Sequence, residues 1–333
     1  MAYIKLNRKN LLYNIKELSL KSGNIKHLSA VLKDNAYGHG IKEIAKIVSD
    51  AGVQEAVVID INEAKAIKSY FKNILILNDT PIKALNFSFA VTSLKALKSA
   101  PKDAKIELKV DTGMHRNGIL MSELSQALTI IKQKKLNLFG VFTHFRSADE
   151  LSSELFWQIK NFQEVKRVVL NRGFRPRFHS HNSAALLRSS NFSEDIARVG
   201  IAMYGYNEVP KIFNTPTLKP VLSLWAKRVS TRELKKGQRV GYGGDFIAPK
   251  DMQISTYDIG YGDGLFRGSS KSSLIVAEGL PILGRVSMDF ISLESTKDEV
   301  CIFNDALQVA KHFNTISYEI TTSLKANLKR VIV

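Results

Sequence analysis

The chain has little cysteine, little proline and no long apolar run. Cys301 is the single cysteine among 333 residues, so no intrachain disulfide can form, and this usage suits a reducing compartment. Prolines number eight, and low-complexity segments are absent from the sequence. No apolar run approaches the roughly 18 residues that span a bilayer, so we expect no membrane partner. The first residues, Met-Ala-Tyr-Ile-Lys-Leu-Asn, lack a basic start followed by an apolar stretch. We therefore expect no signal peptide and a cytoplasmic location.

Charge of one sign is in excess, because the formal net charge is +17. Such an excess raises the possibility of nucleic-acid binding. The basic residues are scattered, however, and many lie on the polar faces of predicted helices, such as Lys42, Lys46 and Lys65. The sequence has no basic tail, no zinc-ligand spacing and no strand that combines aromatic and basic residues as RNA-binding proteins do. We expect a solvated basic surface, no nucleic-acid partner and no metal.

Short apolar runs alternate with amphipathic stretches up to about Tyr204. The runs lie near residues 26–32, 54–58, 74–77, 88–92, 106–110, 138–142, 176–179 and 196–203. Helical periodicity lies between most of them, over 41–48, 61–70, 124–134 and 151–171. Eight strands that alternate with helices predict a parallel sheet, and eight such units can close into a (β/α)8 barrel of the TIM type.

The pattern changes after Pro216. Short strands are predicted over 221–230, 239–242, 252–259, 274–277 and 282–287, and a helix over 304–313. The stretch 207–220 contains three of the eight prolines and predicts a boundary. We therefore expect an α/β chain with two domains, a barrel over residues 1–215 and a mostly-β carboxyl-terminal domain over residues 216–333.

Polar residues fall repeatedly at the carboxyl ends of the predicted barrel strands, where barrel enzymes gather their functional groups. They are Lys33, Lys109, the loop to Arg116, His144, the group His179 to Ser183, and Arg198. Lys33 closes an apolar run, and a glycine-punctuated turn with Tyr37 follows it. A lysine there is a candidate amine nucleophile of the kind that forms a Schiff base, or a solvated lysine past a strand end.

Two further segments could hold a ligand or a proton. Ser183 opens a helix-like segment, and Gly200 and Ile201 allow close backbone approach, so together they could bind a phosphate, although Ser183 could also be a plain helix cap. In the second domain Tyr261 stands among glycines, with its phenol free of bulky neighbours. A tyrosine can act as general acid or base, or it can simply cover a glycine-rich turn.

With these residues in hand, the chain resembles the alanine racemases, which are pyridoxal-phosphate enzymes of fold type III. The resemblance covers nearly the whole chain in order, through seven segments: Lys33 to Gly40, Lys109 to Arg116, Thr143 to Phe145, His179 to Ala185, Arg198 to Gly205, Gly260 to Gly264 and Gly284 to Asp289. It implies an isomerase that interconverts L-alanine and D-alanine, works as a homodimer and supplies D-alanine for peptidoglycan.

The resemblance also implies a role for each matching position. Lys33 would hold pyridoxal 5'-phosphate and act as base on one face of the substrate carbon, and Tyr261 of the partner subunit would be the opposite base. His144 would polarise Tyr261, and Arg198 would face the pyridine nitrogen. Tyr37, Ser183, Gly200 and Ile201 would bind the phosphate, and His179 would pack at the cofactor ring. Arg116 would orient the substrate, and Lys109 (carbamylated in many relatives) would position that arginine. The Met288 main chain would contact the substrate from the partner subunit.

Several alternatives stay open at this point. A racemase of broader amino-acid specificity, or an amino-acid decarboxylase, could share the fold. Decarboxylases that resemble this two-domain fold place an acid at the ring nitrogen, where the resemblance places Arg198 in this chain. A non-catalytic cofactor-binding barrel would resemble the first domain only, and a nucleic-acid binder would account for the charge.

Two positions depart from the family's pattern. Asp34 stands where relatives more often have a small residue. The stretch 322–327 has no tyrosine where relatives commonly carry one that contacts the phosphate. For the second departure we expect one fewer phosphate contact, a wider entrance, or compensation by Tyr318.

Overall fold

The computed structural model describes residues 1–83, 87–268 and 273–333, and its contacts divide the chain into two compact units. One unit comprises residues 12–36 and 44–219, and the other comprises residues 1–11, 37–43 and 220–333. The sequence assigns every residue up to 215 to the barrel, whereas the structure assigns two short amino-terminal segments to the second unit. For the first of these segments the cause is that β1 (Tyr3–Leu6) pairs with β11 (Leu222–Leu234) and β17 (Lys329–Ile332), which lie more than 200 residues further along the chain. No local sequence pattern reveals so distant a pairing.

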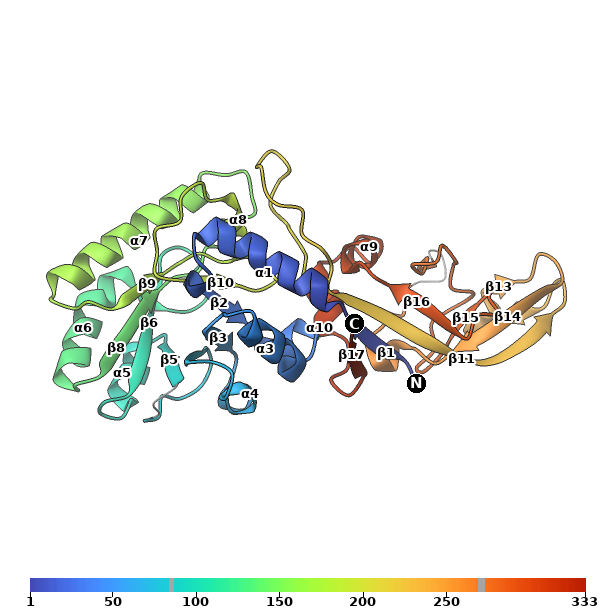
Figure 1. The fold of residues 1–333 in the computed structure, drawn as a ribbon, viewed down its shortest axis with the longest axis horizontal. Coiled ribbons are helices and arrows are strands. Elements are labelled where there is room, and N and C mark those ends of the chain that lie inside the picture. Colours follow the sequence, from blue (N-terminus) through green and yellow to red (C-terminus); the bar gives the residue numbers. More distant parts are fainter. Residues whose placement is uncertain (84–86, 269–272) are drawn as a thin grey trace. The chain divides into compact units, whose positions relative to one another are not determined.

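Eight strands of the first unit form the parallel sheet that the sequence predicts (Figure 1). They are β2 (Leu28–Val31), β3 (Glu55–Val58), β4 (Asn73–Ile76), β5 (Phe87–Val91), β6 (Lys105–Asp111), β8 (Asn137–Phe142), β9 (Arg177–His179) and β10 (Ala197–Val199). Their order is β10-β2-β3-β4-β5-β6-β8-β9, and the short β7 (Ile119–Leu120) pairs with β6. Arg198 N donates to His181 O at 2.9 Å and so links β10 back toward β9. The sheet is a nearly closed barrel, as predicted.

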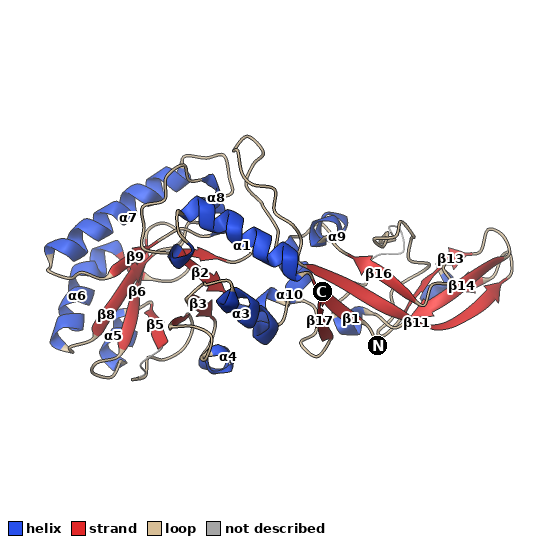
Figure 2. Ribbon diagram, in the orientation of Figure 1, coloured by secondary structure: helices blue, strands red, loops and turns tan. Residues whose placement is uncertain are grey.

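Helices alternate with these strands (Figure 2). They are α1 (Arg8–Ser22), α3 (Ile41–Asp50), α4 (Ile61–Ile67), α5 (Leu94–Ser99), α6 (Leu124–Gln133), α7 (Glu154–Asn171) and α8 (Ser183–Arg188). In α3 the buried residues Ile44, Ile47 and Val48 recur at helical spacing. Gly52, with φ of +102°, follows the end of this helix in the left-handed region that glycine adopts at little cost.

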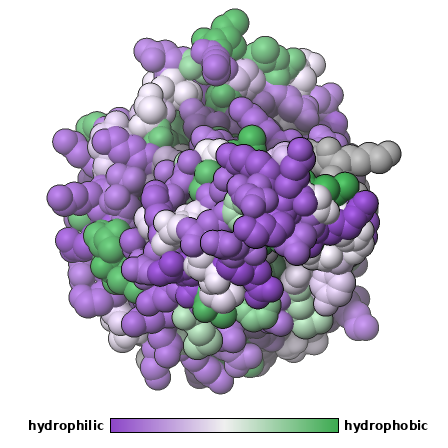
Figure 3. Space-filling model, turned by 90° about the vertical axis from the view of Figure 1, so that its right-hand side faces the viewer, coloured by the Kyte–Doolittle hydropathy of each residue, from purple (hydrophilic) through white to green (hydrophobic). Residues whose placement is uncertain are grey.

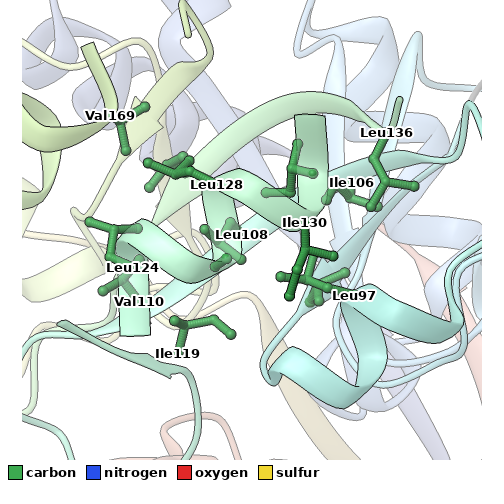
Figure 4. Packing of buried hydrophobic residues seen from close by; sticks show 14 of the residues in the cluster. Leu97, Ile106, Leu108, Val110, Ile119, Leu124, Leu128, Ile130, Leu136 and Val169 are labelled. Carbon is green, nitrogen blue, oxygen red and sulfur yellow. The ribbon is translucent and has the colours of Figure 1, made fainter. Parts of the chain in front are cut away.

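Part of the barrel's hydrophobic core lies between its sheet and its helices (Figure 4). From β6 it includes Ile106, Leu108 and Val110, which pack with α5 and α6 residues such as Leu97 and Leu128. Successive side chains of a strand point to opposite faces. The alternate residues of β6 therefore point into the barrel, and these are charged. This alternation is what places ionisable groups inside the barrel.

The second unit is built on a sheet with the order β15-β14-β11-β1-β17, in which β16 also pairs with β11. Its strands are β11 (Leu222–Leu234), β14 (Met252–Tyr257), β15 (Ile291–Leu293), β16 (Glu299–Phe303) and β17 (Lys329–Ile332), and a hairpin adds β12 (Arg239–Val240) and β13 (Phe246–Ile247). Two helices, α9 (Ala306–His312) and α10 (Ser317–Thr322), complete the unit. A small core of Leu234, Met252, Ile254 and Leu283 packs at the hairpin.

Two predicted strands of this unit are wrong. Residues 274–277 and 282–287 do not form strands, and only an isolated bridge joins Ile275 to Pro281. Gly279 and Gly284 have positive φ values of +80° and +75°, which interrupt the extended backbone, and Pro281 has no N–H to donate. The hydrogen bonds go elsewhere, as when Leu283 N donates to Ser292 O at 2.8 Å.

The surface is polar, in agreement with the charge. The face shown in Figure 3 is mostly hydrophilic, with apolar side chains scattered in small groups. Within the described ranges, none of the helices combines the length and the apolar character needed to cross a membrane.

Candidate active site

Lys33 lies two residues beyond β2, at the carboxyl end of a barrel strand, as predicted. A turn punctuated by glycines follows, as predicted, because Gly38 and Gly40 have φ of +79° and +100°. The residues before these glycines form α2 (Lys33–Tyr37), in which Asp34, Asn35 and Ala36 all have φ of +54°, and Tyr37 has φ of +52°. Left-handed backbone costs a non-glycine residue roughly 1 kcal/mol or more, and least for asparagine and aspartate. The turn after the candidate nucleophile is therefore strained.

Neighbouring groups hold this turn in place. The Glu63 carboxylate accepts hydrogen bonds from Asn35 N at 2.8 Å and from Ile59 N at 3.1 Å. Burial raises the pKa of Glu63, while these two backbone donors oppose the rise. Ala36 N donates to Leu32 O at 2.8 Å, which ties the turn to the strand. Asp34 Oδ2 lies 3.2 Å from Lys33 Nζ, an ion pair in which both side chains are partly exposed.

Lys109 and Arg116 lie near one another on the loop side of β6. The Lys109 side chain is mostly buried and donates a hydrogen bond to Asn117 Oδ1. Burial, together with the positive charges of Arg116 and Arg198, lowers the pKa of Lys109 to about 8. Arg116 itself is exposed. A buried amine with a lowered pKa is partly neutral near pH 8, which is the form that can react with carbon dioxide.

His144 follows β8 and lies in the field of four cations. Burial, together with nearby positive charges, lowers the pKa of His144 to about 3. Those charges are on Arg198, Lys109, Arg116 and Lys33, in order of decreasing effect. The structure thus brings together five of the predicted site residues at one end of the barrel. Such a concentration of cations favours an anionic ligand.

Arg198 on β10 is buried, and fixed acceptors surround its guanidinium. It donates to His179 Nδ1 at 2.5 Å, to Thr143 O at 2.6 Å, to His179 O at 3.1 Å and to Ser180 O at 3.3 Å. Burial lowers the pKa of Arg198 to about 10, while Glu194 and Glu107 raise it. At pH 7 the side chain therefore remains protonated and donates only.

His179 on β9 is enclosed by protein groups. Its side chain is 0% exposed, and its ring stacks on Phe142 with centroids 4.9 Å apart and an interplanar angle of 6°. Both ring nitrogens have protein partners, Arg198 and Glu107. The ring thus lies between Arg198 and Glu107, and packing of His179 at the cofactor ring stays a prediction.

The predicted phosphate site is assembled around Ser183. The cap of α8 is Asn182, which accepts from Ala185 N at 2.9 Å, so the simple alternative of Ser183 as a helix cap is wrong. Ser183 Oγ instead accepts hydrogen bonds from Gly200 N at 3.0 Å and Ala202 N at 3.4 Å. This links the start of α8 to the Gly200–Ile201 turn. The segments predicted to bind an anion are thus neighbours in the barrel unit.

In the second unit Tyr261 and Met288 lie together. Tyr261 begins a short 3-10 turn (Tyr261–Asp263), and its N–H donates to Ser287 O at 3.0 Å, while Gly262 N donates to Met288 O at 2.7 Å. Side chains at both positions are partly exposed, 41% for Tyr261 and 55% for Met288. A Cβ at Gly260 would lie 2.2 Å from Met288 O. Only glycine at that position permits the approach that presents the tyrosine.

Tyr37 and Tyr318 also meet in the second unit. Their rings have centroids 5.7 Å apart in an edge-to-face arrangement. Tyr318 belongs to α10, just before the stretch where relatives carry a phosphate-contacting tyrosine. Tyr318 thus packs on Tyr37, and compensation by Tyr318, one fewer phosphate contact and a wider entrance all stay predictions.

Known proteins show the same organisation along the whole chain. Residues 6–208 match the family described as "Alanine racemase, N-terminal domain", and residues 221–332 match "Alanine racemase, C-terminal domain". The chain belongs to the alanine racemase family. A curated alanine racemase from Nitratiruptor sp. is 49% identical over 99% of both chains. A solved alanine racemase from Clostridium difficile has a TM-score of 0.89 at 27% identity, covering 100% of this chain and 95% of that one.

Another solved structure carries a different substrate name. A histidine racemase from Leuconostoc mesenteroides has a TM-score of 0.88 at 27% identity, and the match covers 100% of this chain and 98% of that one.

The family depends on pyridoxal phosphate. The residues of the barrel unit fit that cofactor, because an amine, a permanently protonated arginine and a cation-rich surrounding suit an aldehyde, a pyridine nitrogen and a phosphate.

Proposed function

We propose that this chain is a cytoplasmic, homodimeric alanine racemase that interconverts L-alanine and D-alanine and supplies D-alanine for peptidoglycan. Family membership along the full chain supports the reaction, as does the gathering of Lys33, Lys109, Arg116, His144 and Arg198 at one end of the barrel. The single buried cysteine, Cys301, is consistent with a reducing compartment.

The observation that carries the proposal is the enclosure of Arg198. Its guanidinium is fixed by His179 and by backbone carbonyls, and it keeps its proton at pH 7. Placed at the pyridine nitrogen, it donates a hydrogen bond without giving up the proton. The ring is then a weaker electron sink than a protonated one. This favours brief removal and return of the Cα proton over the decarboxylation expected where an acid faces the ring.

Each proposed residue has a distinct task. Pyridoxal phosphate, when bound, supplies the electron sink that makes the Cα proton acidic. Lys33 holds the cofactor through Nζ and exchanges a proton at one face of Cα. Tyr261 of the partner subunit exchanges a proton at the opposite face, and His144 orients that phenol. Two bases on opposite faces are sufficient for racemisation.

Binding contacts complete the proposed site. Ser183, Gly200, Ile201 and Tyr37 bind the phosphate, and Tyr318 joins them through its contact with Tyr37. Arg116 orients the substrate carboxylate, with Lys109 holding that loop through Asn117. The main chain of Met288 from the partner subunit contacts the substrate. Because Tyr261 and Met288 come from a second copy, we expect activity to require the dimer.

Product analysis tests the reaction directly. Purified protein incubated with pyridoxal phosphate and L-alanine should form D-alanine until the two enantiomers are equal. Release of carbon dioxide in place of D-alanine would instead identify a decarboxylase.

A racemase of broader specificity is the second candidate, and the histidine racemase of the same fold favours considering it. The two candidates differ in the order of turnover among amino acids. If this chain turns over serine, lysine or histidine faster than alanine under the same conditions, the broader assignment replaces the narrower one.

A further inference from the structure

Glu107 is a buried carboxylate inside the barrel that lies outside the motifs of the family resemblance. It lies on β6 and is 0% exposed. Its Oε1 accepts hydrogen bonds from Ser88 Oγ at 2.5 Å and Arg177 Nη2 at 2.6 Å. Its Oε2 lies 2.7 Å from His179 Nε2 and 3.3 Å from Arg177 Nε. A buried charge is costly unless it is paired, so this carboxylate is held by a complete set of partners.

The barrel provides space for this carboxylate at one neighbouring position. Gly140 on β8 is the register partner of Glu107, and a Cβ at Gly140 would lie 2.4 Å from Glu107 Oε2. The contact is with the carboxylate oxygen that faces His179. A glycine at position 140 therefore allows Glu107 to reach the imidazole.

Two neighbours together determine where His179 carries its proton. A carboxylate only accepts, so His179 Nε2 must donate to Glu107. A guanidinium only donates, so His179 Nδ1 must accept from Arg198, at 2.5 Å. The Nε2–H tautomer satisfies both bonds, whereas the Nδ1–H tautomer would place two N–H groups against each other. Burial also lowers the pKa of His179 to about 4, so the ring is neutral at pH 7.

We propose that Glu107 is a positioning residue, which fixes His179 in the Nε2–H tautomer and through that ring holds the guanidinium of Arg198 in place. The effect on tautomer and orientation follows from the barrel unit alone. The effect on turnover rests on the proposed function, in which Arg198 faces the pyridine nitrogen.

Two variants test whether Glu107 positions Arg198 through His179, which we call the relay, and a third variant serves as the control. Glu107→Gln replaces an obligate acceptor with a group that can also donate to His179. Gly140→Ala leaves every ionisable group in place but crowds the oxygen that faces His179. Ser88→Ala removes a partner of the other carboxylate oxygen and leaves the contact with His179 intact. Each variant is prepared as holoenzyme.

The first readout is the 15N spectrum of the histidine rings, with the His179 signals assigned from a His179→Gln sample. Wild type and Ser88→Ala should show a protonated Nε2 and an unprotonated Nδ1. In Glu107→Gln and Gly140→Ala, Nε2 loses its fixed acceptor and the ring can turn away from Arg198, so both variants should shift toward the other tautomer. An Nδ1–H tautomer in the wild type would overturn the proposal without the need for any variant.

The second readout is the split between kcat and KM for alanine. Loss of an outer hydrogen-bond partner of a metal-ligating histidine typically costs roughly 10-fold or more in affinity or activity, and we expect the same order of magnitude for His179. We expect kcat to fall by roughly that factor in Glu107→Gln and Gly140→Ala, with KM little changed and Ser88→Ala near wild type. A fall in kcat without a change of tautomer would overturn the relay. A wild-type protein that shows the predicted tautomer but no racemisation would refute the proposed function and leave the relay supported.

Discussion

The ring of Tyr318 lies edge-on to the ring of Tyr37, with their centroids 5.7 Å apart. An aromatic pair of this geometry is worth roughly 1 kcal/mol beyond its buried area, about a fivefold change in an equilibrium constant. Removing the Tyr318 ring therefore loosens a residue that we propose contacts the phosphate. The pair joins α10 to the end of the strained turn that follows Lys33.

We expect Tyr318→Ala to weaken binding of pyridoxal phosphate by about fivefold, because Tyr37 loses its packing partner. Tyr318→Phe keeps the aromatic ring, so its affinity for pyridoxal phosphate should fall less than that of Tyr318→Ala. Fluorescence titration of the apoenzyme with the cofactor measures both constants. Equal affinity of wild type and Tyr318→Ala would show that the ring pair contributes nothing to the phosphate site.

Covalent attachment of the cofactor should depend on Lys33 alone. We expect borohydride reduction to fix the cofactor to the wild-type chain, with the modified residue identified by peptide mass. Lys33→Ala should retain none after denaturation, because the other amine at this end of the barrel, Lys109, is mostly buried and bonded to Asn117. The exposed Lys65 on α4 provides a control, and Lys65→Ala should behave as the wild type does. Retention of the cofactor by Lys33→Ala would exclude Lys33 as the attachment site.

Asp34 is explained by the backbone that it must adopt, with φ of +54°. Asparagine and aspartate tolerate the left-handed region better than alanine does. We expect Asp34→Ala to lower the free energy of unfolding by about 1 kcal/mol and Asp34→Asn to be close to neutral, since a partly exposed ion pair with Lys33 contributes little. Urea unfolding of both variants separates the two contributions. If Asp34→Asn and Asp34→Ala lower the free energy of unfolding equally, the negative charge of Asp34, and not its backbone conformation, accounts for the effect.

Acid should destabilise the protein through its buried histidines. The pKa of His144 is lowered to about 3 and that of His179 to about 4, from an unfolded value near 6.5. Their stabilising contribution is complete above pH 6.5 and is lost as the pH falls toward the folded values, because the unfolded chain binds protons that the folded chain does not. Each such histidine contributes a slope of up to about 1.4 kcal/mol per pH unit.

The comparison of variants isolates this effect. Between pH 6.5 and 5, the free energy of unfolding should fall less steeply in His144→Gln than in the wild type, whatever the variant costs at pH 7.5. Parallel slopes for the two proteins would mean that His144 titrates normally in the folded state.

The barrel was predictable because its signals are local. Most of the eight strands lie in short apolar runs, although β9 contains only one apolar residue, and the strands alternate with helices of clear periodicity, as in α3. The candidate site followed from the same reasoning, since polar residues such as Lys33 and Arg198 stand where strands end. Family resemblance then supplied their roles, which strand ends alone do not.

Three features that the sequence did not reveal are the inward polar face of β6, the pairing of β1 and the left-handed turn after Lys33. The alternation of Lys105, Glu107 and Lys109 with apolar residues is also the pattern of a strand with a solvated face, and only the closed barrel shows that its polar face points inward. The pairing of β1 with β11 is equally invisible. The left-handed turn after Lys33 contains no glycine between positions 34 and 37, so the usual local signal is missing.

The central claim is that Lys33 and Tyr261 serve opposite faces of the substrate carbon. The most direct test is exchange of the Cα proton in deuterated water, measured separately for L-alanine and D-alanine. The wild type should exchange both enantiomers and convert each into the other. Tyr261→Phe should lose exchange from one enantiomer far more than from the other, because the face served by Lys33 remains active. Equal loss from both enantiomers would contradict the two-base account.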